Sequence, residues 1–318
     1  MWSWTEWIAD RVIRLARLPP ASGAGAALHF FVFDLLKVTV LIAGIAFLMS
    51  LVRGALPHDQ LRRGLERRHG RLLGYPAAAV FGALTPFCSC SSVPVFLGFV
   101  QARFPIGVAF AFLITSPLVN EIAVALMAAT FGWRLAVGYT AAGITLGIGG
   151  GLVLGALHAE RWLVAGAVPP ADRDDDPPLV GWPARLRDAA NTSFHILRKI
   201  GPWLLLALAL GASLHGFVPA GFFEAWFAGK SAWTVPLASL AGLPLYVSAN
   251  ATVPLLDAFV AKGVPLGTAL AFLLSAVGVS FPELVMLRSV MTVRLLLAFS
   301  LVVLVGTTLI GWLFNVIS

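Results

Sequence analysis

Cys88 and Cys90 are the only two cysteines of the chain, and they stand one residue apart between Pro86 and Pro94. Thiolate sulfur is a soft ligand that selects soft, thiophilic species. A dithiol matches trivalent arsenic bonded to one carbon, because such arsenic has two positions left for sulfur, and cuprous ion also fits. Zinc fits less well, because a closed zinc site needs four ligands and no histidine lies nearby. The cysteine pair therefore predicts a two-sulfur clamp for a thiophilic small molecule.

The cysteine pair interrupts a long apolar stretch, which runs from Pro76 to Phe87 and resumes from Val95 to Val100. Proline has no backbone N–H and disfavours helix at the residue before it, so Pro86 and Pro94 predict irregular backbone between them. In a membrane protein such backbone is tolerated only where it is buried or lines a cavity. We expect the stretch to form the floor of a binding site. The alternative is a proline-kinked helix that holds two inert, small apolar cysteines.

A second apolar stretch, residues 105–132, is interrupted by the polar segment Thr115–Glu121. An ionisable residue inside a membrane segment is expected to be functional. Glu121 is therefore a candidate for proton coupling, and Asn120 could hydrogen-bond the substrate or a carboxylate. Glu283 is the second candidate for proton coupling, in the other half of the chain. The alternative role for both glutamates is to cap half-helices.

The composition indicates the class of protein that must position these residues. The chain is 59% hydrophobic and 12% charged, whereas soluble domains have about 25% charged residues. Several apolar runs reach the roughly 20 residues that a helix needs to cross a bilayer. The net charge of +7 comes from basic residues in short loops, where lipid headgroups and positive-inside bias explain them. The lipid bilayer is therefore an expected partner and nucleic acid is not.

The sequence predicts an all-α polytopic membrane protein with about eight transmembrane segments in two internal repeats with discontinuous helices. The expected parts are an amphipathic N-terminal segment (1–27), a first transmembrane repeat (28–157), a polar linker (158–190) and a second transmembrane repeat (191–318). The eight expected segments are 28–52, 72–102, 105–132, 134–157, 193–216, 231–262, 264–290 and 293–316.

The repeat emerges when the sequence is shifted by 160 residues. Residues 93–113 and 253–273 then share ten identities in 21 positions without a gap, and Pro76 and Gly82 meet Pro236 and Gly242. Fixed-period self-similarity of this kind indicates internal duplication. Many transporters place their substrate site near the midplane between two repeats, where discontinuous helices meet.

The interruptions of the two halves therefore define the expected site. Cys88–Ser92 stand opposite Ser248–Thr252, so that Asn250 meets Cys90. The interruption Ser116–Glu121 stands opposite Ala276–Glu283, where a two-residue gap in the alignment brings Glu121 opposite Glu283. No catalytic residue, metal ligand set or cofactor is predicted. The expected substrate-binding residues are Cys88, Ser89, Cys90, Ser91, Ser116, Asn120, Ser248, Asn250 and Thr252.

At these residues the chain resembles the predicted permeases, a family that includes the ArsP-type organoarsenical efflux permeases. The resemblance rests on Pro86–Pro94, Phe112–Asn120 and Pro244–Ser248. It implies an eight-span, multi-pass permease of the bacterial inner (cytoplasmic) membrane and, for some members, export of trivalent organoarsenicals. The matching family pattern covers Cys88, Cys90, Pro94, Ser116, Pro117 and Asn120. Glu121 departs from it, because other members often have other residues after the asparagine.

Three functions remain open at this point. The first is a secondary transporter that exports a thiophilic small molecule, with Cys88 and Cys90 as transient ligands; no ATP-binding motif is present. The second is a membrane thiol-disulfide oxidoreductase in which the same pair cycles between dithiol and disulfide. The third is a permease for a metal ion or a sulfur species.

Overall fold

The computed structural model of the chain describes residues 3–15, 23–53, 68–85, 89–102, 104–164, 182–217, 233–245 and 249–317. Apart from one isolated antiparallel bridge between Leu163 and Met291, these residues contain no β-structure. The helices of the first half are α1 (Ser3–Leu15), α2 (Gly23–Arg53), α4 (Arg68–Leu84), α5 (Ser89–Gln101), α6 (Ile106–Leu118), α7 (Glu121–Phe131), α8 (Trp133–Ala156) and the 3-10 turn η1 (Ala159–Trp162). The second half has α9 (Trp182–Phe217), α11 (Thr234–Gly242), α12 (Ala249–Ala261), α13 (Leu266–Gly278), α14 (Phe281–Leu287) and α15 (Val293–Ile317).

Three of these stretches are long and apolar enough to cross a membrane: α8, the stretch Leu266–Leu287 that joins α13 and α14, and α15. A fourth span is present if α6 and α7, which are bent by 46° at their break, count as one. The prediction of a helical, multi-pass membrane protein is therefore confirmed. The count of eight segments stays a prediction.

One face of α15 is apolar and exposed along the length of the helix. Leu297, Leu301, Val305 and Leu309 follow each other at intervals of four residues, and each is at least 50% exposed. The opposite face, which includes Phe299 and Val303, is buried. An exposed apolar stripe along a whole helix is unfavourable in water and favourable in a bilayer.

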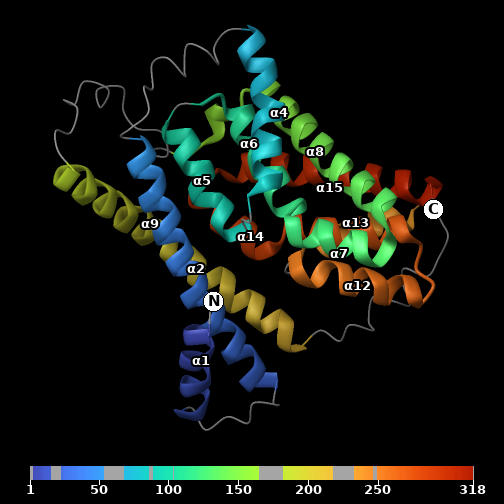
Figure 1. Ribbon diagram of the computed structural model, residues 1–318, viewed down its shortest axis with the longest axis horizontal. Helices are drawn as coiled ribbons and strands as arrows, with labels where there is room; N and C mark the ends of the chain where they lie inside the picture. The colour runs from blue at the N-terminus through green and yellow to red at the C-terminus, as the bar shows by residue number, and fades with distance from the viewer. Residues whose placement is uncertain are drawn as a thin grey trace.

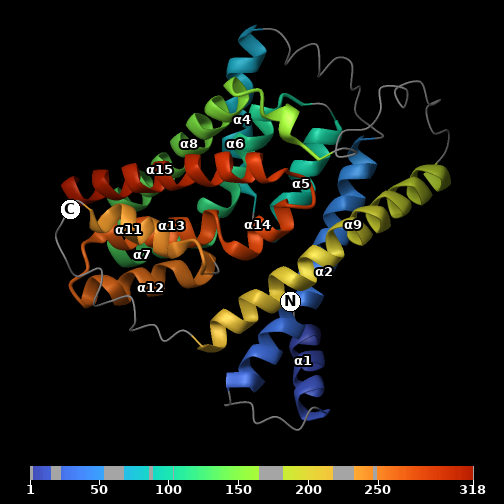
Figure 2. The same cartoon turned by 180° about the vertical axis from the view of Figure 1, so that it is seen from behind.

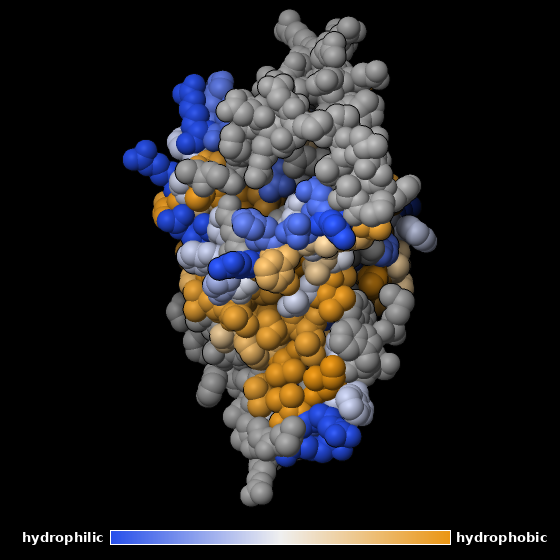
Figure 3. All heavy atoms as spheres, turned by 90° about the vertical axis from the view of Figure 1, so that its left-hand side faces the viewer, coloured by the Kyte–Doolittle hydropathy of each residue, from blue (hydrophilic) through white to orange (hydrophobic). Residues whose placement is uncertain are grey.

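The helices fall into two groups. The long helices α2 and α9 pack along each other and lie to one side of the bundle that the other long helices form (Figures 1 and 2). They contact that bundle through α5 and α14, since α5 packs against α2 and α14 packs against α9. Figure 3 looks onto this side of the molecule and shows a broad hydrophobic area between hydrophilic residues.

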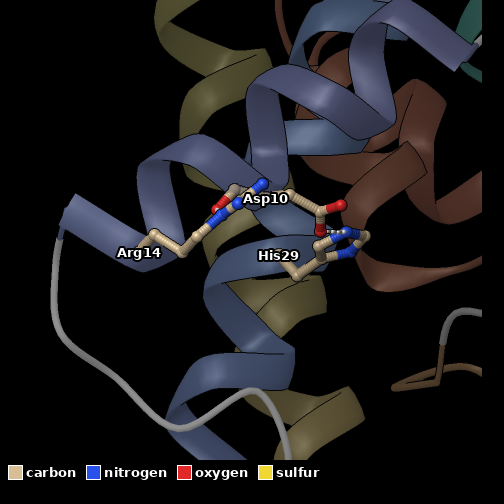
Figure 4. A network of polar contacts seen from close by, with 3 residues as sticks. All are labelled: Asp10, Arg14 and His29. Atoms are coloured by element: carbon tan, nitrogen blue, oxygen red, sulfur yellow. Dashed lines mark hydrogen bonds and ion pairs between the residues drawn. The ribbon is translucent and has the colours of Figure 1, made fainter.

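The N-terminal helix α1 packs against α2. Nε2 of His29 on α2 lies 3.3 Å from Oδ1 of Asp10 on α1, and the Arg14 side chain donates to the Asp10 backbone carbonyl (Figure 4). The Arg11 guanidinium lies 4.6 Å from the centre of the Trp7 ring, which is more than half exposed. The amphipathic segment that we expected at the N-terminus therefore contains a helix, α1.

Within the bundle, glycines bring helices into close contact. A Cβ atom placed on Gly107 of α6 would lie 2.6 Å from the backbone oxygen of Gly151 on α8. A Cβ atom on Gly267 of α13 would lie 2.0 Å from the backbone oxygen of Gly311 on α15. Real Cβ atoms do not approach so closely, so only glycine permits these two crossings.

Helices with equal spacing recur along the chain. The helices α5, α6, α7 and α8 begin at residues 89, 106, 121 and 133, and α12, α13, α14 and α15 begin at residues 249, 266, 281 and 293. In the first half of the chain α6 packs against α4 and α8, and in the second half α13 packs against α11 and α15. The two sets also contact each other, because α7 packs against α12 and α14 packs against α5.

Candidate substrate site at the helix breaks

The break between α6 and α7 lies where the polar interruption predicted it. Val119 and Asn120 have extended backbone, with φ −126° and ψ 111° for Val119 and φ −132° and ψ 160° for Asn120. Oδ1 of Asn120 accepts a hydrogen bond of 2.7 Å from the Ala123 backbone N–H. Asn120 is thus the N-cap of α7, a position that favours asparagine because its side chain satisfies an orphan N–H.

A buried hydrogen bond ties this break to the cysteine motif. The hydroxyl oxygens of Ser92, in the first turn of α5, and Ser116, in the last turn of α6, lie 2.9 Å apart. Both serines are 0% exposed. Since Ser92 is two residues from Cys90 and Ser116 is four from Asn120, the two motifs of the first half come together.

The irregular stretch at the cysteines is shorter than we expected. Irregular backbone was predicted as far as Pro94, but α5 begins at Ser89 and Pro94 is its sixth residue. A proline early in a helix removes a single internal hydrogen bond, and the apolar residues from Val93 onward are buried and hold the helix in place. Because Pro94 has no N–H, the backbone carbonyl of Cys90 lacks its helical donor. Pro254 does the same to Asn250 in α12.

Several predicted ligands cannot be placed in full. Cys88 and Ser248 lie outside the described residues, and Ser89, Cys90, Ser91 and Asn250 lie in helices whose side chains there are not described. Thr252, in the first turn of α12, is 2% exposed. The sulfur clamp therefore stays a prediction, whereas Ser116, Asn120 and Thr252 are all buried near helix breaks.

The two predicted proton-coupling residues have different environments. Glu121 is the first residue of α7 and is exposed. Glu283 is the third residue of α14 and is 1% exposed. Ser280, 160 residues after Asn120, is the N-cap of α14, so Glu283 lies two residues deeper in its helix than Glu121 does.

The breaks of the two halves touch. Leu118 is the last residue of α6 and Gly278 is the last residue of α13. A Cβ atom on Gly278 would lie 2.9 Å from Cδ2 of Leu118. α7 begins three residues after Leu118, and α14 begins three residues after Gly278. The N-terminal ends of α7 and α14 therefore lie in one shared region of the bundle.

Two residues at the breaks were not among the predicted ones. Tyr139 on α8 is buried and its hydroxyl donates to the backbone carbonyl of Leu118. Ser280 is 0% exposed, and its hydroxyl has no hydrogen-bond partner within the described part of the chain. Nothing in the spacing of Tyr139 marks it, because the contact joins helices. Ser280 carries a signal that was overlooked, since it stands opposite Asn120 when the shift of 160 residues is continued without a gap.

The chemistry available at the breaks is that of hydroxyl, amide and carboxyl groups in apolar surroundings. Among the residues that the structure describes, no group of three His, Cys, Asp or Glu side chains could hold a metal ion. A site of this kind can bind a small molecule through a few polar groups that fix its orientation.

Comparison with known proteins places the chain in a family. The family described as predicted permease matches residues 24–316. The UPF0718 protein MJ0584 of Methanocaldococcus jannaschii is 22% identical over 306 residues, which covers 78% of this chain and 83% of that protein. The UPF0718 protein YraQ of Escherichia coli (strain K12) is 27% identical over 268 residues, which covers 83% of this chain and 73% of that protein.

No solved structure matches the chain significantly. The family match, however, extends through both sets of helices. The chain therefore belongs to the predicted permease family.

Proposed function

We propose that the protein is a secondary transporter that exports a thiophilic small molecule, such as a trivalent organoarsenical, across the bacterial inner membrane. Cys88 and Cys90 bind the substrate as a two-sulfur clamp, and the polar groups of the neighbouring breaks orient it. The energy comes from an ion gradient. Membership of a permease family and the lipid-suited helices support transport rather than an enzymatic reaction.

The observation that carries the proposal is the buried bond between the hydroxyls of Ser92 and Ser116. It joins the helix that begins at the cysteine motif to the helix that ends at the Asn120 break. A substrate held by sulfur at the start of α5 would therefore lie next to a second, buried group of polar residues. Soft sulfur ligands supply selectivity for the arsenic atom, and hydrogen-bonding groups would recognise the oxygen atoms on it.

We also propose that the two sets of helices are internal repeats related by the shift of 160 residues. The ring centroids of Phe99 and Phe112 lie 5.3 Å apart at 90°, and those of Phe259 and Phe272 lie 5.6 Å apart at 85°. The glycine crossings follow the same shift. In this arrangement α5–α6 and α12–α13 form two helical hairpins. The first hairpin contacts α14 through α5, and the second contacts α7 through α12, so each hairpin packs against a short helix of the other repeat.

The lengths of the hairpin helices indicate how the broken segments lie in the membrane. α5, α6, α12 and α13 each have 13 residues, whereas a span needs about 20. We propose that each of these four helices crosses only part of the membrane, and that α6 with α7 and α13 with α14 complete a crossing. The half-helices α7 and α14 then carry the chain onward from the shared region at Leu118 and Gly278.

The proposal is tested by uptake into everted membrane vesicles, in which export appears as accumulation. Methylarsenite, arsenite and cuprous ion are compared for the wild type, the double variant Cys88→Ser/Cys90→Ser and the matched variant Gly149→Ala. Cysteine-dependent accumulation of methylarsenite, with Gly149→Ala like the wild type, is the expected result. Equal accumulation by the double variant would exclude the sulfur clamp.

The same vesicles separate the alternatives. Accumulation of cuprous ion alone would favour the metal permease. A thiol-disulfide oxidoreductase would accumulate none of the three substrates, and mild reduction would add two hydrogens to the mass of its Cys88–Cys90 peptide as purified. Substrate-dependent protection of both thiols from alkylation would support the clamp.

A further inference from the structure

α8 and α15, the last helices of the two halves, pack against each other in opposite directions (Figures 1 and 2). Near the start of α8, a Cβ atom on Gly138 would lie 3.4 Å from Cζ of Phe314, which is near the end of α15. Further along α8, a Cβ atom on Gly150 would lie 3.1 Å from Cγ1 of Val302, which is nearer the start of α15. The two helices are therefore antiparallel, although they are equivalent under the shift of 160 residues.

Two pairs of equivalent residues contact each other. Leu146 and Gly306 are 160 residues apart, and a Cβ atom on Gly306 would overlap the Leu146 side chain. Leu118 and Gly278 are also 160 residues apart, and their contact joins α6 to α13. A residue that meets its own equivalent lies on a two-fold axis. Because α8 and α15 are antiparallel, this axis runs across the helices and relates halves of opposite orientation.

The first half has its start at α4 and its end at α8 on the same side of the bundle. The Tyr75 hydroxyl oxygen of α4 would lie 2.7 Å from a Cβ atom on Gly107, at the start of α6, and 2.8 Å from one on Gly155, at the end of α8. Deeper in the bundle, a Cβ atom on Gly82 of α4 would lie 3.0 Å from the backbone oxygen of Phe112 on α6. α4 and α6 therefore run inward from the same end. We call it the η1 end, because η1 packs against α6, α8 and α15.

α5 returns the chain to the η1 end. Its first turn contacts the last turn of α6 through Ser92 and Ser116, and it ends at Gln101, five residues before α6 begins. α4 has 17 residues and α5 has 13, whereas a span needs about 20. The segment 68–101, which includes Cys88 between its two helices, therefore enters and leaves the bundle at one end.

The second half has its start at α11 and its end at α15 on the opposite side. A Cβ atom on Gly311, near the end of α15, would lie 2.6 Å from Cγ1 of Val235, at the start of α11. Oδ1 of Asn315 accepts a hydrogen bond of 2.8 Å from the backbone N–H of Gly267, at the start of α13. α12 ends at Ala261, five residues before α13 begins. The segment 234–261, which includes Asn250, therefore enters and leaves at the end opposite to η1.

α9 connects the two ends. α8 ends at the η1 end and α11 begins at the opposite one, and the 36 residues of α9 exceed the roughly 20 that a span needs. The second half then crosses the bundle with α9, with α13 and α14 together, and with α15. An odd number of crossings reverses the orientation of one repeat relative to the other, in agreement with the antiparallel packing of α8 and α15.

The basic residues differ between the two ends. Residues 53–71, which lead into α4, contain six arginines, and three further arginines lie at the η1 end, Arg161, Arg288 and Arg294. The opposite end has Arg134 after Gly132, Lys262 after α12 and, between α9 and α11, Lys230. Its share remains the smaller one when the arginines of the N-terminal segment are added. Lys and Arg gather in cytoplasmic connections, so the η1 end is assigned to the cytoplasm.

We propose that the two halves are inverted-topology repeats, with the segment of Cys88 and Cys90 open to the cytoplasm and the segment of Asn250 open to the opposite face. This inference rests on the proposed transporter function and deepens it, because it assigns the two routes to the site. Substrate enters along α4 and α5, where sulfur binds it, and leaves along α11 and α12. Rocking of one repeat against the other about the two-fold axis opens one route and closes the other.

The test compares equivalent residues in the full-length protein, with both native cysteines replaced by serine. Arg134 and Arg294 are the second residues of α8 and α15 and are exposed, and Ala156 and Val316 are an exposed pair near the ends of the same helices. One residue at a time is replaced by cysteine, and intact bacteria are treated with a maleimide that cannot pass the inner membrane. Arg134→Cys and Val316→Cys should react in intact cells. Arg294→Cys and Ala156→Cys should react only after permeabilisation.

The two members of a pair decide between the orientations. Reaction of both members from the same side would show parallel repeats and overturn the inference. Exchange of the two sides would overturn the assignment of the cysteine segment to the cytoplasmic route. Labelling of the unfolded protein confirms that each cysteine is present and reactive. The pair Ala156→Cys and Val316→Cys removes no charge, so it decides if loss of an arginine alters the topology.

The last residues of α5 and α12 give a third pair, which tests the two re-entrant segments. Gln101→Cys should react only after permeabilisation, and Ala261→Cys should react in intact cells. Reaction of Gln101→Cys in intact cells would show that α5 reaches the other face and would overturn the inference. None of these measurements needs a substrate, so their failure is distinguishable from a failure of the transport proposal, which vesicle uptake decides.

Discussion

Tyr139 of α8 donates a hydrogen bond to the backbone carbonyl of Leu118, the residue with which α6 ends. The last carbonyls of a helix have no donor within it, and in a membrane an unsatisfied carbonyl is costly. Tyr139 therefore stabilises the α6–α7 break from a neighbouring span. The counterpart of Tyr139 in the second half is Phe299, which has no hydroxyl. The two breaks consequently differ: the first is held by side chains, and the second leaves the Ser280 hydroxyl available.

Replacement of Tyr139 by phenylalanine should destabilise the protein. The variant leaves the Leu118 carbonyl buried without this donor, at a cost of about 1–3 kcal/mol. The melting temperature of the detergent-solubilised protein measures the effect. Tyr75→Phe is the matched control, because Tyr75 is also buried and forms no hydrogen bond within the described residues. Equal melting temperatures for the two variants would show that the Tyr139 bond does not stabilise the break.

The bond between Ser92 and Ser116 should appear as a coupling energy. Ser92→Ala and Ser116→Ala each remove one hydroxyl of this bond, whereas the double variant removes both. We expect the double variant to be less destabilised than the sum of the single ones by about 1 kcal/mol. Chemical unfolding of the three variants and the wild type measures the cycle. Strict additivity would mean that the start of α5 is not anchored to the end of α6.

The positions of the breaks could be predicted from the sequence, because proline and polar residues inside an apolar run disfavour a continuous helix at that place. The break at Val119 and Asn120 and the one at Val279 and Ser280 both fall within the predicted interruptions. The start of α5 at Ser89 was not predicted, because buried contacts of later residues outweigh the effect of Pro94.

Contacts between distant helices could not be predicted from local patterns. The exchange of half-helices, with α7 on α12 and α14 on α5, depends on how the whole bundle packs. The contrast between exposed Glu121 and buried Glu283 also follows from this packing and from a difference of two residues in helix position. The two-residue gap that aligns Glu121 with Glu283 hides this difference in helix position. The ungapped shift of 160 residues pairs Asn120 with Ser280 and shows it.

Two glycine substitutions on α8 should differ in their effect on stability, because one glycine lies in a close helix contact and the other has free space around it. A Cβ atom on Gly151 would lie 2.5 Å from the Gly107 backbone oxygen, whereas one on Gly149 would meet nothing within 4 Å. We expect Gly151→Ala to lower the melting temperature strongly, because two backbones must separate. Gly149→Ala should be neutral or stabilising by up to about 1 kcal/mol, since alanine favours helix. If the two variants behave alike, α6 and α8 do not cross at these glycines.

Asn120 should show separate effects on stability and on transport. Asn120→Ala removes the N-cap of α7 and should cost about 0.5–2 kcal/mol, whereas Asn120→Asp keeps an oxygen that accepts from the Ala123 N–H. The melting temperature should therefore fall for the alanine variant and stay near the wild-type value for the aspartate variant. If Asn120 also donates to the substrate through its amide N–H₂, transport should be lost in both, because a carboxylate has no such donor. Normal uptake by a stable Asn120→Asp protein would limit Asn120 to its capping role.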